Sequence, residues 1–228
     1  MPKERKPQSY YDDIKRKFAE ERDLRLNYRP EGTSQFTSVL TGDLAKYAVD
    51  PYGDETRERN PIKDQVEVLF IGGGFSALLT SARLREKGIE SIRIVERGAD
   101  VGGTWYWNRY PGVACDVVSY DYLPLLDEMD YVPVNHYSRG AEILTHCQAI
   151  ANKYDLYKLA VFQTTVTGTI WNEEEQLWHV KTDRGDHMRA QFVICANGTL
   201  SKPKLSRIEG MESFKGHSFH TSRWDYDY

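Results

Sequence analysis

A glycine-rich loop followed by an acidic residue one strand later is the most chemically specific feature of the sequence. Residues 72–77 read Gly-Gly-Gly-Phe-Ser-Ala, which fits the pattern G-x-G-x-x-A, and they follow a short apolar run at 66–71. Glu96 ends the next apolar run. A bare glycine pattern is weak, but a preceding strand, a following helix and a later acid together predict a dinucleotide-binding loop.

Each residue of this loop has a physical task in such a site. Gly72 permits the tight turn out of the strand, and Gly74 lacks a Cβ, so the backbone can approach a diphosphate. Ala77 is small enough for the helix to pack closely on the strand, and the helix start offers unpaired N–H groups to the phosphates. Glu96 can accept hydrogen bonds from ribose hydroxyls and would repel a 2′-phosphate, which favours FAD or NAD over NADP at this loop.

A second loop, residues 102–116, reads GGTWYWNRYPGVACD and is unusually aromatic. A second glycine pair with a tryptophan behind it, so soon after Glu96, fits a loop that follows a long cofactor towards a flat head group. Small residues at 196–198 would also let the backbone approach a cofactor. We therefore favour a flavin. Plain core packing remains the alternative for the aromatic rings, and Asp116 taken alone is better interpreted as a turn or capping residue.

The elements that must position these loops form a strand–loop–helix–strand unit. Continuous apolar runs indicate strands buried on both faces, and Gly88 is a typical helix end. A helical pattern and two alternating strands around an acidic turn follow, and then another buried strand. The sequence predicts an α/β fold, a Rossmann-like FAD-binding domain with a parallel sheet, a βαβ unit and an antiparallel excursion. The expected elements are strands 66–71, 91–97, 161–174, 175–185 and 190–198, and helices 76–88 and 138–156.

The first sixty residues differ from the rest in composition and in the pattern of apolar positions. Residues 12–27 have helical composition, residues 41–50 suggest a short helix, and residues 50–61 read as a polar, turn-rich linker. We expect a partly helical N-terminal extension over 1–60, packed on the N-terminal part of an FAD-binding domain over 61–228. Partial disorder of the extension is the alternative.

Composition narrows the function classes. The chain has 228 residues, 40% of them hydrophobic, and a formal net charge of −4, so nucleic acid is not an expected partner. No apolar run approaches the ~20 residues that cross a bilayer, and no export signal is visible, so we expect a cytoplasmic protein without a membrane partner. Three cysteines indicate a reducing compartment, and neither they nor the histidines have metal-ligand spacing.

Two motifs together identify a family resemblance over roughly residues 62–228. The aromatic loop resembles the flavin-proximal loop of Baeyer–Villiger monooxygenases, the class B flavoprotein monooxygenases. Residues 214–225 fit the family fingerprint F-x-G-x-x-x-H-x-x-x-W-[P/D] at every fixed position. The resemblance implies that NADPH reduces FAD, that the reduced flavin and O2 form a peroxyflavin, and that a ketone substrate becomes an ester or lactone.

The resemblance also implies residue roles. Asp116 matches the active-site aspartate that helps to position an arginine beside the flavin, and Val166 is the match for a backbone contact to adenine. His220 and Trp224 belong to the fingerprint, which implies a structural or coupling role rather than proton transfer. The implied FAD-binding residues are Gly72, Gly74, Phe75, Ser76, Ala77, Glu96, Gly103, Thr104, Trp105, Asp116, Tyr122 and Val166.

The sequence departs from the family pattern in two ways. Ser206 stands where relatives often have proline, and the chain ends at Tyr228, before the NADPH domain and its own glycine motif. We therefore expect a fragment or truncated product that does not turn over NADPH alone. The missing domain would lie in the same longer chain or in a second chain. The alternatives are a flavin monooxygenase that oxidises N or S atoms, and a non-catalytic FAD-binding module.

Overall fold

The computed structural model describes residues 6–27, 36–37, 42–53, 58–206 and 208–228. The chain divides into two compact units, residues 1–38 with 204–216 and residues 39–203 with 217–228. The expected domain boundary near residue 61 and the packing of the N-terminal extension stay predictions.

A six-stranded sheet is the centre of the larger unit, in the order β4-β3-β2-β7-β6-β5. The first four strands are parallel, and β6 and β5 continue the sheet antiparallel. This confirms the predicted α/β class with its antiparallel excursion. The strands are β2 (Gln65–Ile71), β3 (Ile92–Val95), β4 (Ala160–Val161), β5 (Val166–Asn172), β6 (Leu177–Thr182) and β7 (His187–Cys195).

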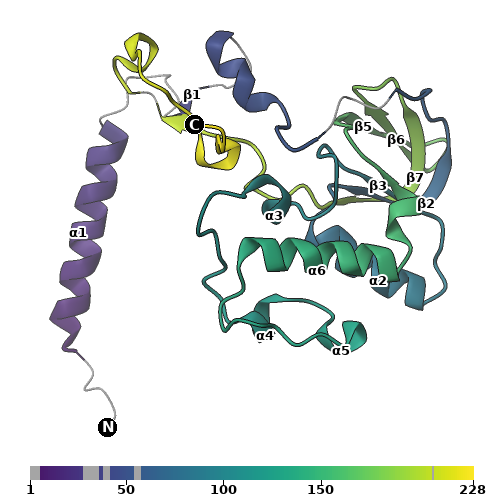
Figure 1. Ribbon diagram of the computed structural model, residues 1–228, viewed down its shortest axis with the longest axis horizontal. Coiled ribbons are helices and arrows are strands. Elements are labelled where there is room, and N and C mark those ends of the chain that lie inside the picture. The colour runs from purple at the N-terminus through teal and green to yellow at the C-terminus, as the bar shows by residue number, and fades with distance from the viewer. Residues whose placement is uncertain (1–5, 28–35, 38–41, 54–57, 207) are drawn as a thin grey trace. The chain divides into compact units, whose positions relative to one another are not determined.

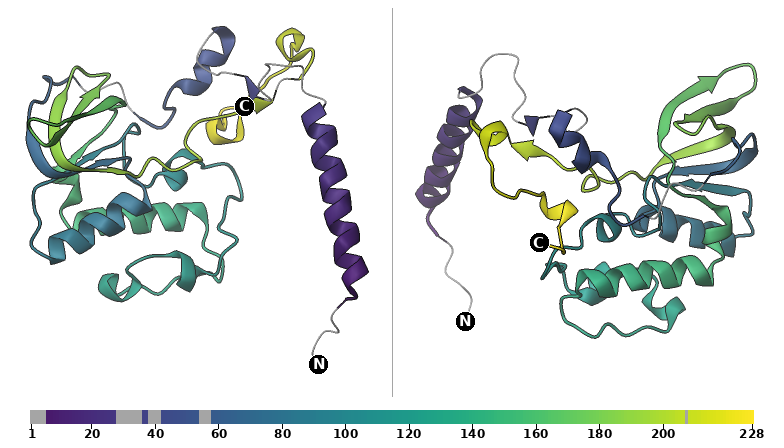
Figure 2. Two further views of the ribbon diagram at one scale, coloured as in Figure 1. Left: turned by 180° about the vertical axis from the view of Figure 1, so that it is seen from behind. Right: turned by 45° about the horizontal axis from the view of Figure 1, so that its top comes forward.

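Two helices, α2 (Phe75–Glu86) and α6 (Gly140–Lys153), cover one face of this sheet (Figures 1 and 2). Phe70 of β2 packs with Leu78 of α2 and Ile150 of α6, and none of the three is exposed. Burying a side chain of this size stabilises the fold by about 1.5–3 kcal/mol. The packing therefore fixes the start of α2 directly above the end of β2.

The opposite face of the sheet is also apolar. Leu69 of β2 lies in a second cluster with Val180 of β6 and Met188 of β7. Because β2 is buried on both faces, its sequence is continuously apolar rather than alternating. This is why the strand could be recognised from the sequence.

Short elements fill the stretch between β3 and α6. They are α3 (Thr104–Trp107), α4 (Ser119–Tyr122) and α5 (Leu126–Met129). A third apolar cluster joins Trp105, Cys115 and Leu123 to Ile143 of α6. The aromatic loop is therefore anchored on α6, and we call residues 102–116 the aromatic arm.

Three 3-10 helices complete the larger unit's helical segments among the described residues. They are η1 (Gly42–Ala48), η2 (Leu156–Leu159) before β4, and η4 (Thr221–Arg223). Tyr47 of η1 is buried, and its hydroxyl donates to the carbonyl of Ser218 at 3.2 Å. This contact joins η1 to the C-terminal segment.

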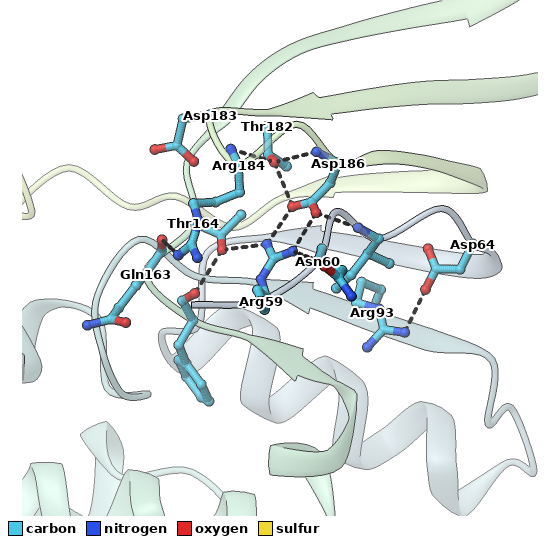
Figure 3. A network of polar contacts seen from close by, with 12 residues as sticks. Arg59, Asn60, Asp64, Arg93, Gln163, Thr164, Thr182, Asp183, Arg184 and Asp186 are labelled. Carbon is cyan, nitrogen blue, oxygen red and sulfur yellow. Dashed lines mark hydrogen bonds and ion pairs between the residues drawn. The ribbon is translucent and has the colours of Figure 1, made fainter. Parts of the chain in front are cut away.

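An ion pair fixes the segment that enters β2 (Figure 3). The Arg59 guanidinium contacts both carboxylate oxygens of Asp186, at 2.5 and 2.6 Å, and donates to Thr164 Oγ1 at 3.1 Å. Asp186 also accepts from the Ile62 N–H and the Thr182 hydroxyl. The residues before β2 are thereby joined to the β6–β7 turn.

The smaller unit is described by three features. Helix α1 (Gln8–Asn27) begins before the predicted 12–27 and has no buried residue. Strands β1 (Phe36–Thr37) and β8 (Leu205–Ser206) pair antiparallel, and η3 (Met211–Ser213) follows β8. In the described part of the chain, no helix is long and apolar enough to span a membrane.

Candidate dinucleotide site

Two glycine loops meet at the carboxyl end of β2. The Gly102 N–H donates to the Gly73 carbonyl at 3.0 Å, and a Cβ on Gly103 would lie 2.9 Å from the Gly74 Cα. Gly72 has φ +110°, and a Cβ there would lie 2.5 Å from the Ala196 carbonyl oxygen. The first loop, the second loop and the end of β7 are thus brought together by positions that tolerate no larger side chain.

The start of α2 is open to an anion. No side chain caps the helix at Gly74, and the first turn carries no acidic residue. Phe75 is half-buried, Ser76 is exposed and Ala77 is fully buried against the core. A Cβ built on Gly74 meets only Gly103 within 4 Å, so the rest of this approach is empty. We call the surface formed by residues 72–77 and Gly103 the glycine cradle. It fits a diphosphate group, which needs backbone N–H donors and no Cβ in its way.

Glu96 lies beside this cradle and is only 5% exposed. Its carboxylate accepts the Gly73 N–H at 2.5 Å and the Gly98 N–H at 2.6 Å. Burial raises the pKa of Glu96, and the two N–H donors oppose that rise. The side chain is therefore held by backbone donors at the end of β3, where a ribose of a bound dinucleotide would lie.

The aromatic arm builds a wall next to the cradle. Trp105 is 7% exposed and donates from its indole N–H to the Tyr122 hydroxyl at 3.0 Å, with the rings edge to face. The Phe75 ring lies 5.4 Å from the Tyr122 ring. Thr104 is half-buried in the first turn of α3. These contacts bring Phe75, Trp105 and Tyr122 into one cluster, with Thr104 next to Trp105 in the chain, and their roles towards FAD stay predictions.

The next two rings of the arm are buried more deeply. Tyr106 and Trp107 are each 2% exposed and lie edge to face. The Tyr106 hydroxyl donates to Asp50 at 2.7 Å and accepts from the Ala99 N–H at 3.1 Å. These rings are core residues of the arm, and Asp50 fixes them from the segment before β2.

Asp116 and Val166 are the least constrained of the predicted site residues. Asp116 is exposed just after Cys115, and within the described ranges no hydrogen bond or ion pair is found for it. Val166 begins β5 and is half-buried against the second cluster. The chain just before it runs along the end of β3, because the Thr164 N–H donates to the Glu96 carbonyl. Both roles stay predictions.

The fingerprint segment at residues 214–225 contains a local turn at η4. His220 Nδ1 caps η4 by accepting the Ser222 N–H at 3.1 Å. The Arg223 guanidinium lies 4.7 Å from the centre of the Trp107 ring and donates to the Val49 carbonyl. Arg223 thus joins this segment to the aromatic arm, and the structural or coupling role of His220 stays a prediction.

Sequence reasoning missed several partners of this site. Asp50, Tyr52 and Arg59 lie in the stretch interpreted as a plain linker, yet each contacts the domain. Arg97 and Arg223 both stack over Trp107. A signal existed only for Arg97, which directly follows Glu96. The other contacts join residues far apart in the chain.

Comparisons with known proteins agree with this geometry. A family model described as pyridine nucleotide-disulphide oxidoreductase matches residues 69–228. Pentalenolactone D synthase of Streptomyces arenae is 50% identical over 94% of this chain and 36% of its own length. A Baeyer-Villiger monooxygenase of Streptomyces coelicolor is 47% identical over 94% of this chain and 35% of its own length.

Solved structures give the same result. A polycyclic ketone monooxygenase from the thermophilic fungus Thermothelomyces thermophila has a TM-score of 0.80 and 35% identity, over 88% of this chain and 35% of that one. The structure titled OTEMO complex with FAD and NADP has a TM-score of 0.66 and 33% identity, over 75% of this chain and 32% of that one. The chain therefore spans about a third of the length of the proteins it matches.

Proposed function

We propose that this chain, which belongs to the pyridine nucleotide-disulphide oxidoreductase family and to its Baeyer–Villiger monooxygenase group, is the FAD-binding portion of a longer ketone-oxidising enzyme. In that protein, NADPH and O2 would be co-substrates, and a ketone would be converted to an ester or lactone. The observation that carries the proposal is the meeting of two glycine loops with Glu96 at the start of an uncapped helix.

The residues of the chain have distinct tasks in this proposal. Gly72, Gly74 and Gly103 leave room for the diphosphate, Glu96 holds a ribose, and Trp105 with Tyr122 forms a wall towards the isoalloxazine ring. The bound flavin supplies the redox chemistry with NADPH and O2. The protein contributes position and exclusion of water, for which buried aromatic rings are suited.

Two parts of the proposal depend on residues outside this chain. Asp116 would orient an arginine that the remaining sequence supplies, and its exposure leaves it free to do so. The NADPH site would likewise come from the remaining two thirds, in the same chain or in a second one. We expect the 228-residue chain alone to bind FAD without consuming NADPH. The cytoplasmic location stays a prediction.

The Gly74→Ala variant tests the cradle itself. A Cβ at Gly74 lies 3.4 Å from the nearest atom, the Gly103 Cα, and φ there is −85°, so the fold accepts alanine. The methyl group would occupy the diphosphate approach instead. We expect unchanged thermal stability without cofactor and at least a tenfold weaker FAD affinity, which is about 1.4 kcal/mol.

Flavin fluorescence titration measures this affinity. The matched control is Gly168→Ala in β5, where an added Cβ has no neighbour within 4 Å. It should bind FAD like the parent chain. Equal FAD affinity in the Gly74→Ala and parent proteins would remove the diphosphate from this loop and reject the proposed site.

The reaction is tested with the longer protein. NADPH consumption and product analysis with a ketone panel and with a thioether would separate ketone oxidation from S-oxidation. Ester or lactone formation supports the proposal. Oxidation of the thioether with no ketone product would assign a related N- or S-oxidising monooxygenase instead. FAD binding with no NADPH oxidation would indicate a non-catalytic module.

A further inference from the structure

Three arginines gather around aromatic rings of the larger unit. The Arg97 and Arg223 guanidinium carbons lie 4.4 and 4.7 Å from the centre of the Trp107 ring. Arg109 lies over Tyr52 at 4.1 Å and over Tyr106 at 4.7 Å. The three rings are themselves in edge-to-face contact, from Tyr52 to Tyr106 and from Tyr106 to Trp107. These groups form one continuous cluster.

The Asp50 carboxylate in this cluster already accepts hydrogen bonds at both oxygens. One oxygen of Asp50 accepts the Tyr52 N–H at 3.0 Å. The other accepts the Tyr106 hydroxyl at 2.7 Å and the Ala99 N–H at 3.1 Å. No ion pair joins Asp50 to any of the three arginines in the described part of the chain. Three guanidinium groups therefore face two carboxylates, Asp50 in the cluster and Glu96 beside Arg97.

Two buried donors in the same cluster have no acceptor. Arg223 is 7% exposed, and its Nε and Nη1 donate to the carbonyls of Val49 and Ser222. Its Nη2 is buried with no hydrogen-bond partner, and so is the Tyr52 hydroxyl oxygen. A buried polar group left without a partner destabilises the folded chain. Two such groups in one place indicate that an acceptor belongs there.

The electrostatic environment of Arg97 and Arg223 also favours a bound anion. Burial lowers the pKa of Arg223, and the charge of Arg97 lowers it further. Burial also lowers the pKa of Arg97, and the charges of Glu96 and Asp50 only partly oppose it. Arg97 and Arg223 are thus in an environment that disfavours their charge, and a bound anion would stabilise the charged forms. Tyr52 and Arg223 interact electrostatically, so the two unsatisfied groups belong to one locality.

We propose that Tyr52, Arg97 and Arg223 form a binding site for an oxyanion, a phosphate or carboxylate group, separate from the glycine cradle. Guanidinium groups present paired donors that match either anion, and a phenol adds a third direction. Tyr52 and Arg97 are half-buried, so the cluster has an edge at the surface, while the Tyr52 hydroxyl oxygen and Arg223 Nη2 lie beneath it. The site does not depend on the assignment of FAD to the cradle.

Thermal unfolding of the 228-residue chain tests this site. Sodium phosphate and sodium acetate are each titrated against sodium chloride at equal ionic strength and pH 7. We expect a saturable rise in Tm with at least one of the two oxyanions. The larger effect identifies the source, phosphate pointing to a phosphorylated ligand and acetate to a carboxylate.

Two variants locate the bound anion. Tyr52→Phe keeps the ring under Arg109 and removes only the hydroxyl, and Arg223→Lys keeps the charge and removes the fork. Each should weaken the apparent affinity about tenfold or more, the value of one charge-assisted hydrogen bond. In chloride, Tyr52→Phe should be at least as stable as the parent, because it removes an unsatisfied hydroxyl.

The controls are Tyr120→Phe, whose tyrosine is 64% exposed, and Arg83→Lys on the outside of α2. Both should keep the anion response of the parent chain. An absence of any oxyanion-specific rise in Tm would overturn the site. An equal rise in Tyr52→Phe, Arg223→Lys and the parent would also overturn it, because the anion would then be bound elsewhere.

Discussion

The Arg59–Asp186 ion pair should control the acid stability of the larger unit. The Asp186 side chain has no exposed surface, and Arg59 is 22% exposed. Burial alone would raise the pKa of Asp186, but Arg59, the Ile62 N–H and the Thr182 hydroxyl outweigh it and lower the pKa to about 2. The perturbation we consider is Asp186→Asn, which keeps the shape and removes the charge.

The magnitude follows from this pKa. Against an ordinary aspartate pKa of about 3.9, a folded value of about 2 corresponds to about 2.5 kcal/mol of stability near neutral pH. Removing one charge of a buried ion pair costs about 3–5 kcal/mol. The cost should be smaller here, because Arg59 is partly exposed to solvent and the asparagine amide can keep part of the hydrogen bonding. We therefore expect Asp186→Asn to lose about 2–3 kcal/mol at pH 7.

The pH dependence gives the sharper test. Because the pKa is lower in the folded state, the stabilisation is complete above about pH 5 and is lost progressively as pH falls through the folded value near 2. By pH 3 roughly half of it should have gone, leaving about 1.3 kcal/mol. The gap between the parent and Asp186→Asn should therefore shrink by more than about 1 kcal/mol between pH 7 and pH 3.

Urea unfolding followed by tryptophan fluorescence at pH 7, 5, 4 and 3 measures this gap. The matched control is Asp155→Asn, because Asp155 pairs with Lys158 at the surface, where both side chains are more than half exposed. It should change stability little at any pH. A gap for Asp186→Asn that stays constant from pH 7 to pH 3 would show that the charge of Asp186 is not the source of the stabilisation.

Three further predictions concern the candidate site. Tyr122→Phe removes the acceptor of the Trp105 indole N–H and should cost about 1 kcal/mol in urea unfolding, with no added loss in the Trp105→Phe background. Gly103→Ala should destabilise the chain by about 1–3 kcal/mol, unlike Gly74→Ala, because its Cβ would lie 2.9 Å from the Gly74 Cα; differential scanning calorimetry compares the two. Glu96→Gln should lower both stability and FAD affinity, because its amide would point a donor at the N–H of Gly73 or Gly98; a parent-like FAD titration would contradict the ribose role.

The amino-acid sequence by itself determined the central unit of the fold. The apolar run of β2, the loop at 72–77 and the helix before Gly88 were all recognisable because local requirements set them. A strand buried on both faces must be continuously apolar, and a turn at φ +110° needs a glycine. Such constraints act between neighbouring residues, so they can be recognised without the tertiary structure.

Tertiary structure decided which distant residues meet. Asp50 fixes Tyr106, Asp186 holds Arg59, and Arg223 lies over Trp107, although 116 positions separate the last two. No periodicity or turn requirement marks these pairs, because each depends on how the sheet, the arm and the tail pack together. The sequence therefore predicted only a linker at 50–61, whereas in the folded chain Asp50 and Arg59 of this stretch are partners of buried polar groups.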